Sequence, residues 1–198
     1  MFGKKIGLNI LMIRLICLVL FLNSCSKKDD SGYRVYTIDK GNHYSDGPID
    51  KLFGNDNKST LWEWEVIFDS SCIYSESDLV NSSNYLDVNK LIGFSDCDRH
   101  HSQYSCRVGW RASGDSIELL IYKRDDNNIS FKSLEKVYTD QVVNITLEFK
   151  DSIYISCIDG NCDALERPCT DWVGRKYSLF PFFGGQETAP HEMKIRIK

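Results

Sequence analysis

Residues 106–123 read CRVGWRASGDSIELLIYK, which is the pattern of two β-strands joined by a tight turn. In the first run, Cys106, Val108 and Trp110 alternate with two arginines and a glycine. Residues 113–115, Ser-Gly-Asp, form the turn, and a second strand-like run follows at 117–123. A period of two residues places alternate side chains on opposite faces, as in a strand with one buried face. The segment therefore predicts two consecutive strands in a β-rich domain.

The same two-residue period recurs on both sides of this segment. It is found at residues 61–68, 142–149, 152–158 and 193–197. Only residues 77–91 and 130–138 are candidates for helical turns, and neither has a sustained helical stripe. Many short strands separated by turns predict an all-β fold. We expect an antiparallel β-sandwich of jelly-roll type, stabilised by disulfides, with an eight-stranded barrel as the alternative.

Composition and charge exclude several classes of protein. The chain has 198 residues, 42% of them hydrophobic and 12% aromatic, which excludes a disordered or collagen-like chain. Its formal net charge is −4, and the first 24 residues carry three basic and no acidic residues, so the remainder carries −7. General nucleic-acid binding needs a broad basic surface. We therefore expect one acidic, folded domain with no nucleic-acid partner.

The N-terminal segment predicts the location of the protein. Its apolar run, LICLVLFL at 15–22, follows basic residues and is too short for a membrane-spanning helix, which needs about 20 apolar residues. A secretory signal peptide fits better. The run ends in LNSC at 22–25, which resembles a bacterial lipobox with Cys25 as the lipidated residue. The alternative is an ordinary signal peptide with a chance cysteine.

The residues after Cys25 support the lipoprotein interpretation. The polar stretch that contains Asp29 and Asp30 is similar to the export tether of Bacteroidota surface lipoproteins. We expect a signal peptide at 1–24, a lipidated tether at 25–32 and a single β-sandwich domain at 33–198. The expected location is the outer membrane, with exposure at the cell surface and membrane contact through the lipid anchor alone. The sequence does not indicate an oligomeric state.

Six cysteines remain after the lipidated one: Cys72, Cys97, Cys106, Cys157, Cys162 and Cys169. An even number in an exported chain predicts disulfides, and six cysteines allow 15 pairings. A bond between Cys97 and Cys106 would close a short loop. The alternatives are free thiols, or a zinc site formed by the last three cysteines, whose spacing lacks a Cys-x-x-Cys pair.

Two arginines of the first quoted strand are candidate ligand-binding residues. Arg107 and Arg111 lie on one face, about 13 Å apart along an extended backbone. Gly109 between them removes bulk where a ligand could approach. Guanidinium groups bind carboxylate and sulfate groups with two hydrogen bonds. The alternative is a solvated face on which the arginines pair with Glu63, Glu65 or Glu118.

Histidines and tyrosines supply the candidates for acid–base chemistry, because an imidazole can remove a proton and a phenol can donate one. The candidate catalytic residues are His100, His101, Tyr104 and Tyr177, and the candidate ligand-binding histidines are His43 and His191. Neighbouring side chains of an extended segment point in opposite directions, so one of the adjacent histidines at most faces a given site. Polar loop surface is the alternative role.

We expect no cofactor and no catalytic metal. Structural calcium is an option at the acidic pairs Asp125–Asp126 and Asp96/Asp98, although surface carboxylates are the more common explanation of such pairs.

A late aromatic segment, YSLFPFFGG at 177–185, is a candidate platform for sugar rings, with core packing as the alternative. Its glycine pair permits a sharp bend, and Pro181 indicates a strand edge or a bulge. The polar loop GNHYSDG at 41–47 is a candidate rim of a binding site, although turn chemistry alone would also explain it.

A family resemblance is carried by five segments, GNHYS at 41–45, His100–His101, RVGWR at 107–111, FFGG at 182–185 and APH at 189–191. Together they resemble an uncharacterised family of Bacteroidota surface lipoproteins with a concanavalin-like jelly roll. The chain is also similar, more weakly, to jelly-roll alginate lyases, which carry an arginine-bearing strand, a Gln-x-His element and a late tyrosine-rich strand. That similarity implies that Arg107 and Arg111 correspond to the arginines, and His100 or His101 to the histidine.

These observations favour a surface-anchored, non-catalytic β-sandwich whose partner is a glycan, an anionic one if the arginines bind it. One alternative is a polysaccharide lyase that cleaves a uronate-containing glycan by β-elimination. Such a lyase needs a cation for the uronate, a base for the C5 proton and an acid at the leaving oxygen. The other alternative is a structural or adhesion lipoprotein that binds a protein.

Overall fold

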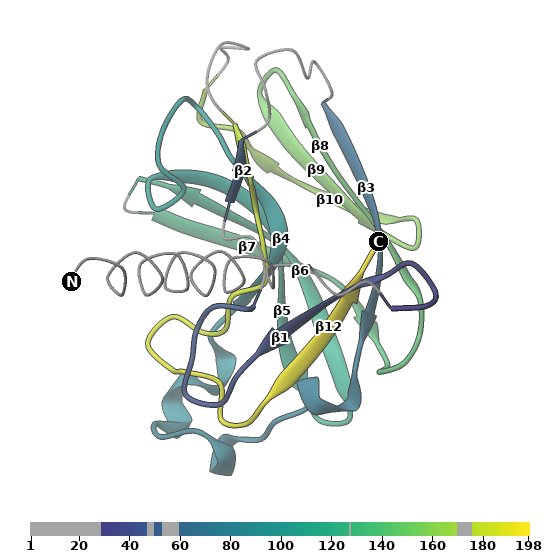
Figure 1. The fold of residues 1–198 in the computed structure, drawn as a ribbon. Helices are drawn as coiled ribbons and strands as arrows, with labels where there is room; N and C mark the ends of the chain where they lie inside the picture. Colours follow the sequence, from purple (N-terminus) through teal and green to yellow (C-terminus); the bar gives the residue numbers. More distant parts are fainter. Residues whose placement is uncertain (1–28, 47–49, 53–59, 127, 170–175) are drawn as a thin grey trace, which may run out of the picture.

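A computed structural model describes residues 29–46, 50–52, 60–126, 128–169 and 176–198 (Figure 1). The expected signal peptide and the lipidated Cys25 lie outside the described residues. Among the helices of the described residues, none is both long and apolar enough to span a membrane.

The described chain forms two six-stranded antiparallel sheets (Figure 1). Sheet A has the order β1 (Arg34–Ile38), β12 (Met193–Ile197), β3 (Leu61–Phe68), β8 (Val143–Lys150), β9 (Ile153–Ile158) and β10 (Asn161–Glu166). Sheet B has the order β2 (Asp50–Leu52), β11 (Tyr177–Leu179), β4 (Asn89–Ser95), β5 (Tyr104–Ser113), β6 (Ser116–Asp125) and β7 (Asn128–Val137). The two sheets pack as a sandwich, which confirms the predicted fold class.

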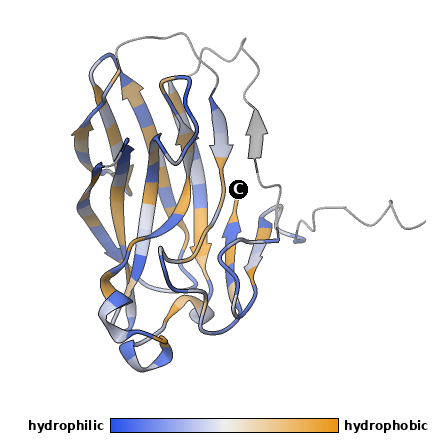
Figure 2. Ribbon diagram, turned by 90° about the vertical axis from the view of Figure 1, so that its left-hand side faces the viewer, coloured by the Kyte–Doolittle hydropathy of each residue, from blue (hydrophilic) through white to orange (hydrophobic). Residues whose placement is uncertain are grey.

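The core lies between the sheets and is built by the alternation seen in the sequence (Figure 2). On β5, Cys106, Val108 and Trp110 are fully buried, so the residues between them face away from sheet A. Trp110 packs against Phe68 and Phe183, with ring centroids 5.6 and 6.1 Å apart. The outer face of β5 is consequently free to line a site.

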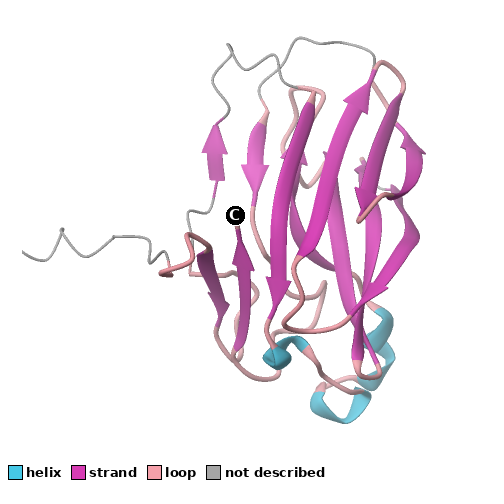
Figure 3. Ribbon diagram, turned by 90° about the vertical axis from the view of Figure 1, so that its right-hand side faces the viewer, coloured by secondary structure: helices cyan, strands magenta, loops and turns pink. Residues whose placement is uncertain are grey.

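The two segments with weak helical character have different outcomes. Short 3-10 turns do occur in or beside residues 77–91, at Glu76–Asp78 and Ser82–Leu86. A further 3-10 turn lies at Ser70–Cys72, and all three are found at one end of the sandwich (Figure 3). The helical alternative for residues 130–138 is wrong, because residues 130–137 belong to the edge strand β7 and Tyr138 follows it in a loop without helical turns. The pairing of β7 with β6 shifts register between Leu119 and Leu120, and this irregularity interrupts the two-residue period.

The described residues form two disulfides, one between Cys97 and Cys169 and one between Cys157 and Cys162. The suggested Cys97–Cys106 bond is wrong, because Cys106 points into the core while Cys97 lies in the loop after β4. The zinc alternative is also wrong, since its three cysteines are all in disulfides.

The prediction that all six cysteines form disulfides is wrong for Cys72 and Cys106, which are free and fully buried. Burial raises the pKa of both thiols far above the usual range, so they remain protonated and unreactive.

A buried ionic cluster joins the sheets beside the first disulfide. The Asp96 carboxylate accepts hydrogen bonds from Arg167 Nε and from the Tyr154 hydroxyl, each over 2.7 Å, and Lys176 Nζ lies 3.2 Å from it. The side chains of Asp96 and Arg167 are both completely buried. This carboxylate is fully engaged by cations and a hydroxyl, so it is unsuited to the calcium role considered for the Asp96/Asp98 pair.

Candidate functional site

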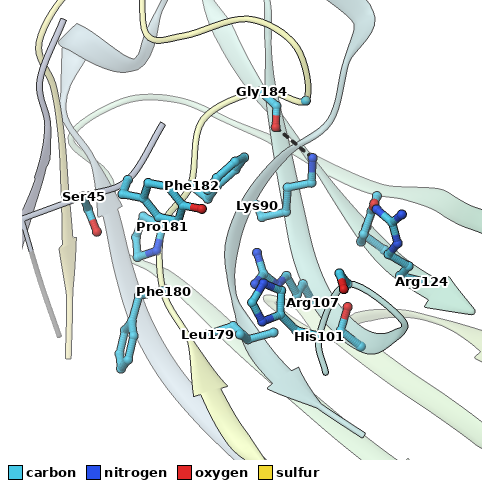
Figure 4. Close-up of a pocket in the computed structure, with 15 residues that line it drawn as sticks. Ser45, Lys90, His101, Arg107, Arg124, Leu179, Phe180, Pro181, Phe182 and Gly184 are labelled. Atoms are coloured by element: carbon cyan, nitrogen blue, oxygen red, sulfur yellow. Dashed lines mark hydrogen bonds between the residues drawn. The ribbon is translucent and has the colours of Figure 1, made fainter. Parts of the chain in front are cut away.

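A pocket of about 260 Å³ opens on the outer face of sheet B (Figure 4). Its volume lies just below the range of about 300–1,000 Å³ typical of small-molecule sites. Strands β4, β5 and β6 form one side, and the loop after β11 forms the other. The lining residues are Tyr44, Ser45, Lys90, His101, Ser102, Ser105, Arg107, Tyr122, Arg124, Leu179, Phe180, Pro181, Phe182, Gly184 and Gly185.

Three cationic side chains line this pocket: Lys90 from β4, Arg107 from β5 and Arg124 from β6. None of the described residues that line it carries a carboxylate. Arg107 is only 8% exposed, and the Nε atom of Arg124 is buried without a hydrogen-bond partner among the described residues. Cations gathered in a partly desolvated site favour an anionic ligand, because screening by water is reduced there.

Lys90 lies where the cationic side meets the aromatic side (Figure 4). Its Nζ donates a hydrogen bond to the Gly184 carbonyl over 2.9 Å and lies 5.4 Å from the centre of the Tyr122 ring. Burial lowers the pKa of Lys90 to about 8, and the positive charges of Arg107 and Arg124 act in the same direction. The charge of this lysine therefore changes within an accessible pH range.

The opposite side of the pocket is aromatic. Phe182 bridges to both Tyr44 and Lys90 through isolated β-bridges, which fixes the loop against the sheet. The Tyr44 ring meets Phe182 edge-on at 4.9 Å and is 63% exposed. Gly184 turns the chain at a positive φ of 68°, and a Cβ there would collide with the backbone of Glu187. An exposed aromatic ring beside cations suits a sugar that carries an acidic group.

His101 enters the pocket in a fixed orientation. Its backbone amide donates to the Tyr177 hydroxyl over 2.8 Å, and its Nδ1 lies 2.9 Å from the same oxygen. The hydroxyl can therefore donate its own hydrogen to Nδ1, which leaves the ring hydrogen on Nε2. Burial, with the charge of Arg107 next, lowers the pKa of His101 to about 4. The imidazole is thus neutral at neutral pH.

The structure separates the two arginines that the sequence paired. Arg107 lines the pocket, whereas Arg111 Nε donates to Glu118 over 2.6 Å and its Nη1 donates to the Leu86 carbonyl. The expected ligand space at Gly109 is occupied, because the Val88 side chain packs where a Cβ would lie. For Arg111 the salt-bridge alternative is the correct one, and Gly109 makes room for Val88.

The other candidate residues lie around the pocket or away from it. His43 stacks on Phe182 with ring centroids 5.1 Å apart, and its Nδ1 lies 2.9 Å from the Phe183 carbonyl oxygen, so it packs against the aromatic side of the pocket. His100 is exposed and hydrogen-bonds Ser102. His191 lies against the Ser71 carbonyl.

Neither His191 nor Tyr104 lines the pocket, and Tyr104 sits on β5 opposite Asp125. Asp125 lies 3.4 Å from Lys123 Nζ, so a nearby cation already neutralises part of the Asp125–Asp126 pair considered for calcium. One cluster of the described residues brings possible metal ligands together, Asp96 with Cys97 and Cys169, but these cysteines are bonded to each other.

Among the lining residues not anticipated from the sequence are Lys90, Tyr122 and Arg124. The last two could have been found, because they follow the two-residue period of β6 and lie opposite Arg107 and Ser105. Lys90 has no such local signal, since its position in the site depends on the pairing of β4 with β5.

No family model matches the chain, and no curated protein matches it. Solved structures with the same fold include the alginate lyase AlyC3, with a TM-score of 0.56 and 12% identity over 90% of this chain and 77% of that chain. The marine PL7 alginate lyase AlyA1 from Zobellia galactanivorans has a TM-score of 0.53 and 11% identity, over 85% of this chain and 76% of the lyase.

A third solved structure, the catalytic domain of an endo-1,3-beta-glucanase (laminarinase) from Thermotoga petrophila RKU-1, has a TM-score of 0.53 and 8% identity, over 85% and 75% of the two chains. At such identities the likeness concerns the fold alone. The predicted similarity to jelly-roll alginate lyases is therefore confirmed for the architecture, and the described chain is a β-sandwich of the jelly-roll type.

Proposed function

We propose that this protein is a surface-anchored lipoprotein that binds an anionic glycan in the pocket on sheet B, without cleaving it. The observation that carries the proposal is the gathering of Lys90, Arg107 and Arg124 in a pocket whose described lining has no carboxylate. An arginine can grip a sugar carboxylate or sulfate through two parallel hydrogen bonds. The solved neighbours support a glycan ligand, since alginate lyase AlyC3 has been solved with dimannuronate.

The aromatic wall complements this charge. Tyr44 offers an exposed ring, and Phe182 holds that ring in place. Sugar rings present C–H groups on their faces, which pack well against aromatic side chains, while their acidic substituents point outward to the cations. The pocket thus combines one contact for the ring with another for the charge.

The test is a titration of the full chain, purified in detergent, against alginate oligomers and matched neutral glucan oligomers. Binding should be saturable for the acidic oligomers only. Arg107→Gln should weaken it by about tenfold or more, because a hydrogen bond to a charged group contributes about 1.5–3 kcal/mol. Arg196→Gln is the matched control, since Arg196 lies on β12 of the other sheet and pairs with Asp140. Equal losses in both variants would exclude the pocket as the site.

Lyase activity is the second candidate, and the contact between His101 and Tyr177 favours it. In the tautomer that carries its hydrogen on Nδ1 and donates it to the Tyr177 oxygen, the Nε2 atom of the neutral imidazole is free to accept the C5 proton of a uronate. The acid is harder to assign, because Phe180, Phe182 and Phe183 have no hydroxyl and Tyr177 does not line the pocket. Tyr122 does line it, and burial raises its pKa, so it stays protonated.

Ultraviolet absorbance separates the two candidates, because β-elimination creates a conjugated double bond and binding does not. A steady rise with alginate that is lost in His101→Ala would establish the lyase and overturn the non-catalytic proposal. A flat trace, together with saturable binding by the same preparation, supports the binding protein.

The proposed anchoring needs its own test, since it rests on the sequence of the first 30 residues. The full chain should partition with the outer membrane when expressed in a bacterium that processes lipoproteins. Cys25→Ala should release it into the soluble fraction, because the acyl chains provide the membrane affinity. Release without loss of glycan binding would show that the anchor and the pocket act independently.

A further inference from the structure

A row of residues on three neighbouring strands leads from the pocket across sheet B. Arg107 on β5 lies directly opposite Tyr122 on β6, and Tyr122 lies directly opposite Phe131 on β7. Directly opposed residues of antiparallel strands project from the same face of a sheet. The three side chains therefore form one line on the outer face, with Phe131 at the open edge.

A second row runs beside the first. Arg124 of the pocket lies opposite Ile129 of β7. Phe131 is 45% exposed and Ile129 is 51% exposed, so the two rows end in neighbouring apolar side chains that face solvent. The two rows thus lead from the cationic pocket to two exposed apolar residues on β7, and we call the surface along these rows the platform.

The far end of the platform also carries charge. The guanidinium carbon of Arg111 lies 6.0 Å from the centre of the Phe131 ring. Arg111 is held there by its bonds to Glu118 and to the Leu86 carbonyl. Phe131 therefore has a fixed cation beside one face of its ring. The pocket contains a similar pair, Lys90 beside Tyr122, so an aromatic ring next to a cation occurs both in the pocket and at the β7 edge of the sheet.

We infer that the pocket is one end of a longer groove in which Phe131 stacks against a sugar ring two units further along the ligand, so that the ligand is an acidic oligosaccharide chain of at least three rings. Neighbouring strands are about 4.8 Å apart, so the backbones at Arg107 and Phe131 are separated by about 10 Å. The spacing between strands is comparable with the repeat of a pyranose chain. A chain that crosses the strands would place one ring at Arg107 and a later ring at Phe131.

This inference rests on the proposed function and makes a separate prediction about chain length. The full chain is titrated with alginate oligomers from dimer to hexamer. The affinity of the wild type should rise with length until the platform is covered. Phe131→Ala should leave the dimer affinity within about twofold and lower the hexamer affinity about tenfold, whereas Phe131→Trp should retain the length dependence. Tyr138→Ala is the matched control, since Tyr138 is 56% exposed just beyond the end of β7.

The outcomes are distinguishable. Equal dimer and hexamer affinities in the wild type, or an unchanged hexamer affinity in Phe131→Ala, would overturn the groove and leave the pocket intact. No binding of any oligomer by the wild type would remove the proposed function and the groove together. If Phe131→Ala changes the sedimentation coefficient of the free protein instead of the hexamer affinity, the platform is a contact between copies of the chain and the inference is wrong.

Discussion

Val88 lies over Gly109 on the outer face of sheet B, with its Cγ1 only 2.4 Å from the position that a Cβ at residue 109 would take. Val88 is 6% exposed and packs with Leu120 and Tyr122 in a small cluster outside the main core. This contact places an apolar side chain between Arg107 and Arg111 and gives the two arginines separate roles.

The first prediction follows from this contact. Gly109→Ala should lower the free energy of unfolding by about 1–3 kcal/mol, because the stiff, buried valine cannot move aside without strain. Denaturant unfolding monitored by tryptophan fluorescence measures the change. Val88→Ala combined with Gly109→Ala should recover part of the loss. A double variant no more stable than Gly109→Ala would show that the collision involves the backbone instead.

The second prediction concerns the ionic cluster between the sheets. Asp96→Asn leaves the buried Arg167 cation without its carboxylate and should cost about 3–5 kcal/mol of stability. Arg167→Met should cost less, because Lys176 and Tyr154 still satisfy the carboxylate. Thermal or urea unfolding of both variants checks the order. A smaller loss for Asp96→Asn than for Arg167→Met would contradict it.

The same cluster predicts an acid-sensitive fold. Burial alone would raise the pKa of Asp96, but Arg167, Lys176 and Tyr154 outweigh it and hold that pKa below its usual range. The stabilisation by Asp96 is therefore present above the ordinary carboxyl pKa of about 4 and is lost as the pH falls through the lower folded value. Urea midpoints between pH 7 and pH 2 should show this loss in the wild type, and Asp96→Asn should show a smaller one.

The third prediction is that binding of acidic oligosaccharides weakens as the pH rises from 7 to 9. Lys90 has a pKa of about 8 and loses its positive charge over this range. A bound anion favours the protonated lysine, so binding takes up protons and becomes weaker as the pH rises. Calorimetric titrations in buffers of different ionisation heat measure both effects. Lys90→Arg should bind with little change over the same range, and an identical pH dependence in that variant would exclude Lys90 as the titrating group.

The fourth prediction ranks the two disulfides. Cys97–Cys169 links residues 72 apart, whereas Cys157–Cys162 links residues 5 apart across the β9–β10 hairpin. In the chain-entropy model, the first bond contributes about 4 kcal/mol and the second about 2 kcal/mol. Replacing both cysteines of each bond by serine, in separate variants, should give this order in urea unfolding.

The Cys97–Cys169 bond also holds the loop that carries His101. Its removal should therefore weaken glycan binding, while removal of Cys157–Cys162, on the other sheet, should leave binding unchanged. Equal binding by both serine variants would show that the loop is held by the Tyr177 contact without help from the disulfide.

Much of the sandwich follows from local pattern. Runs with a two-residue period at β3, β5, β8 and β12 each predicted a strand with one buried face, and the turn at Gly114 has the positive φ that its sequence suggests. β7 was missed as a strand because it lies at an edge and shifts register. Its buried, half-buried and exposed side chains do not alternate along the strand, so they carry no two-residue signal.

The sequence by itself determined the strand-rich fold, the inward and outward faces of β5, and Arg107 and His101 as candidate site residues. The tertiary structure decided which side chains meet. Lys90 reaches Arg107 only through the pairing of β4 with β5, Cys97 finds a cysteine 72 residues away, and Val88 divides the two arginines. The physical reason is that the alternation of buried and exposed residues is set by neighbours in the sequence. Which strands pair, and which side chains then meet, depends on packing between residues far apart in the chain.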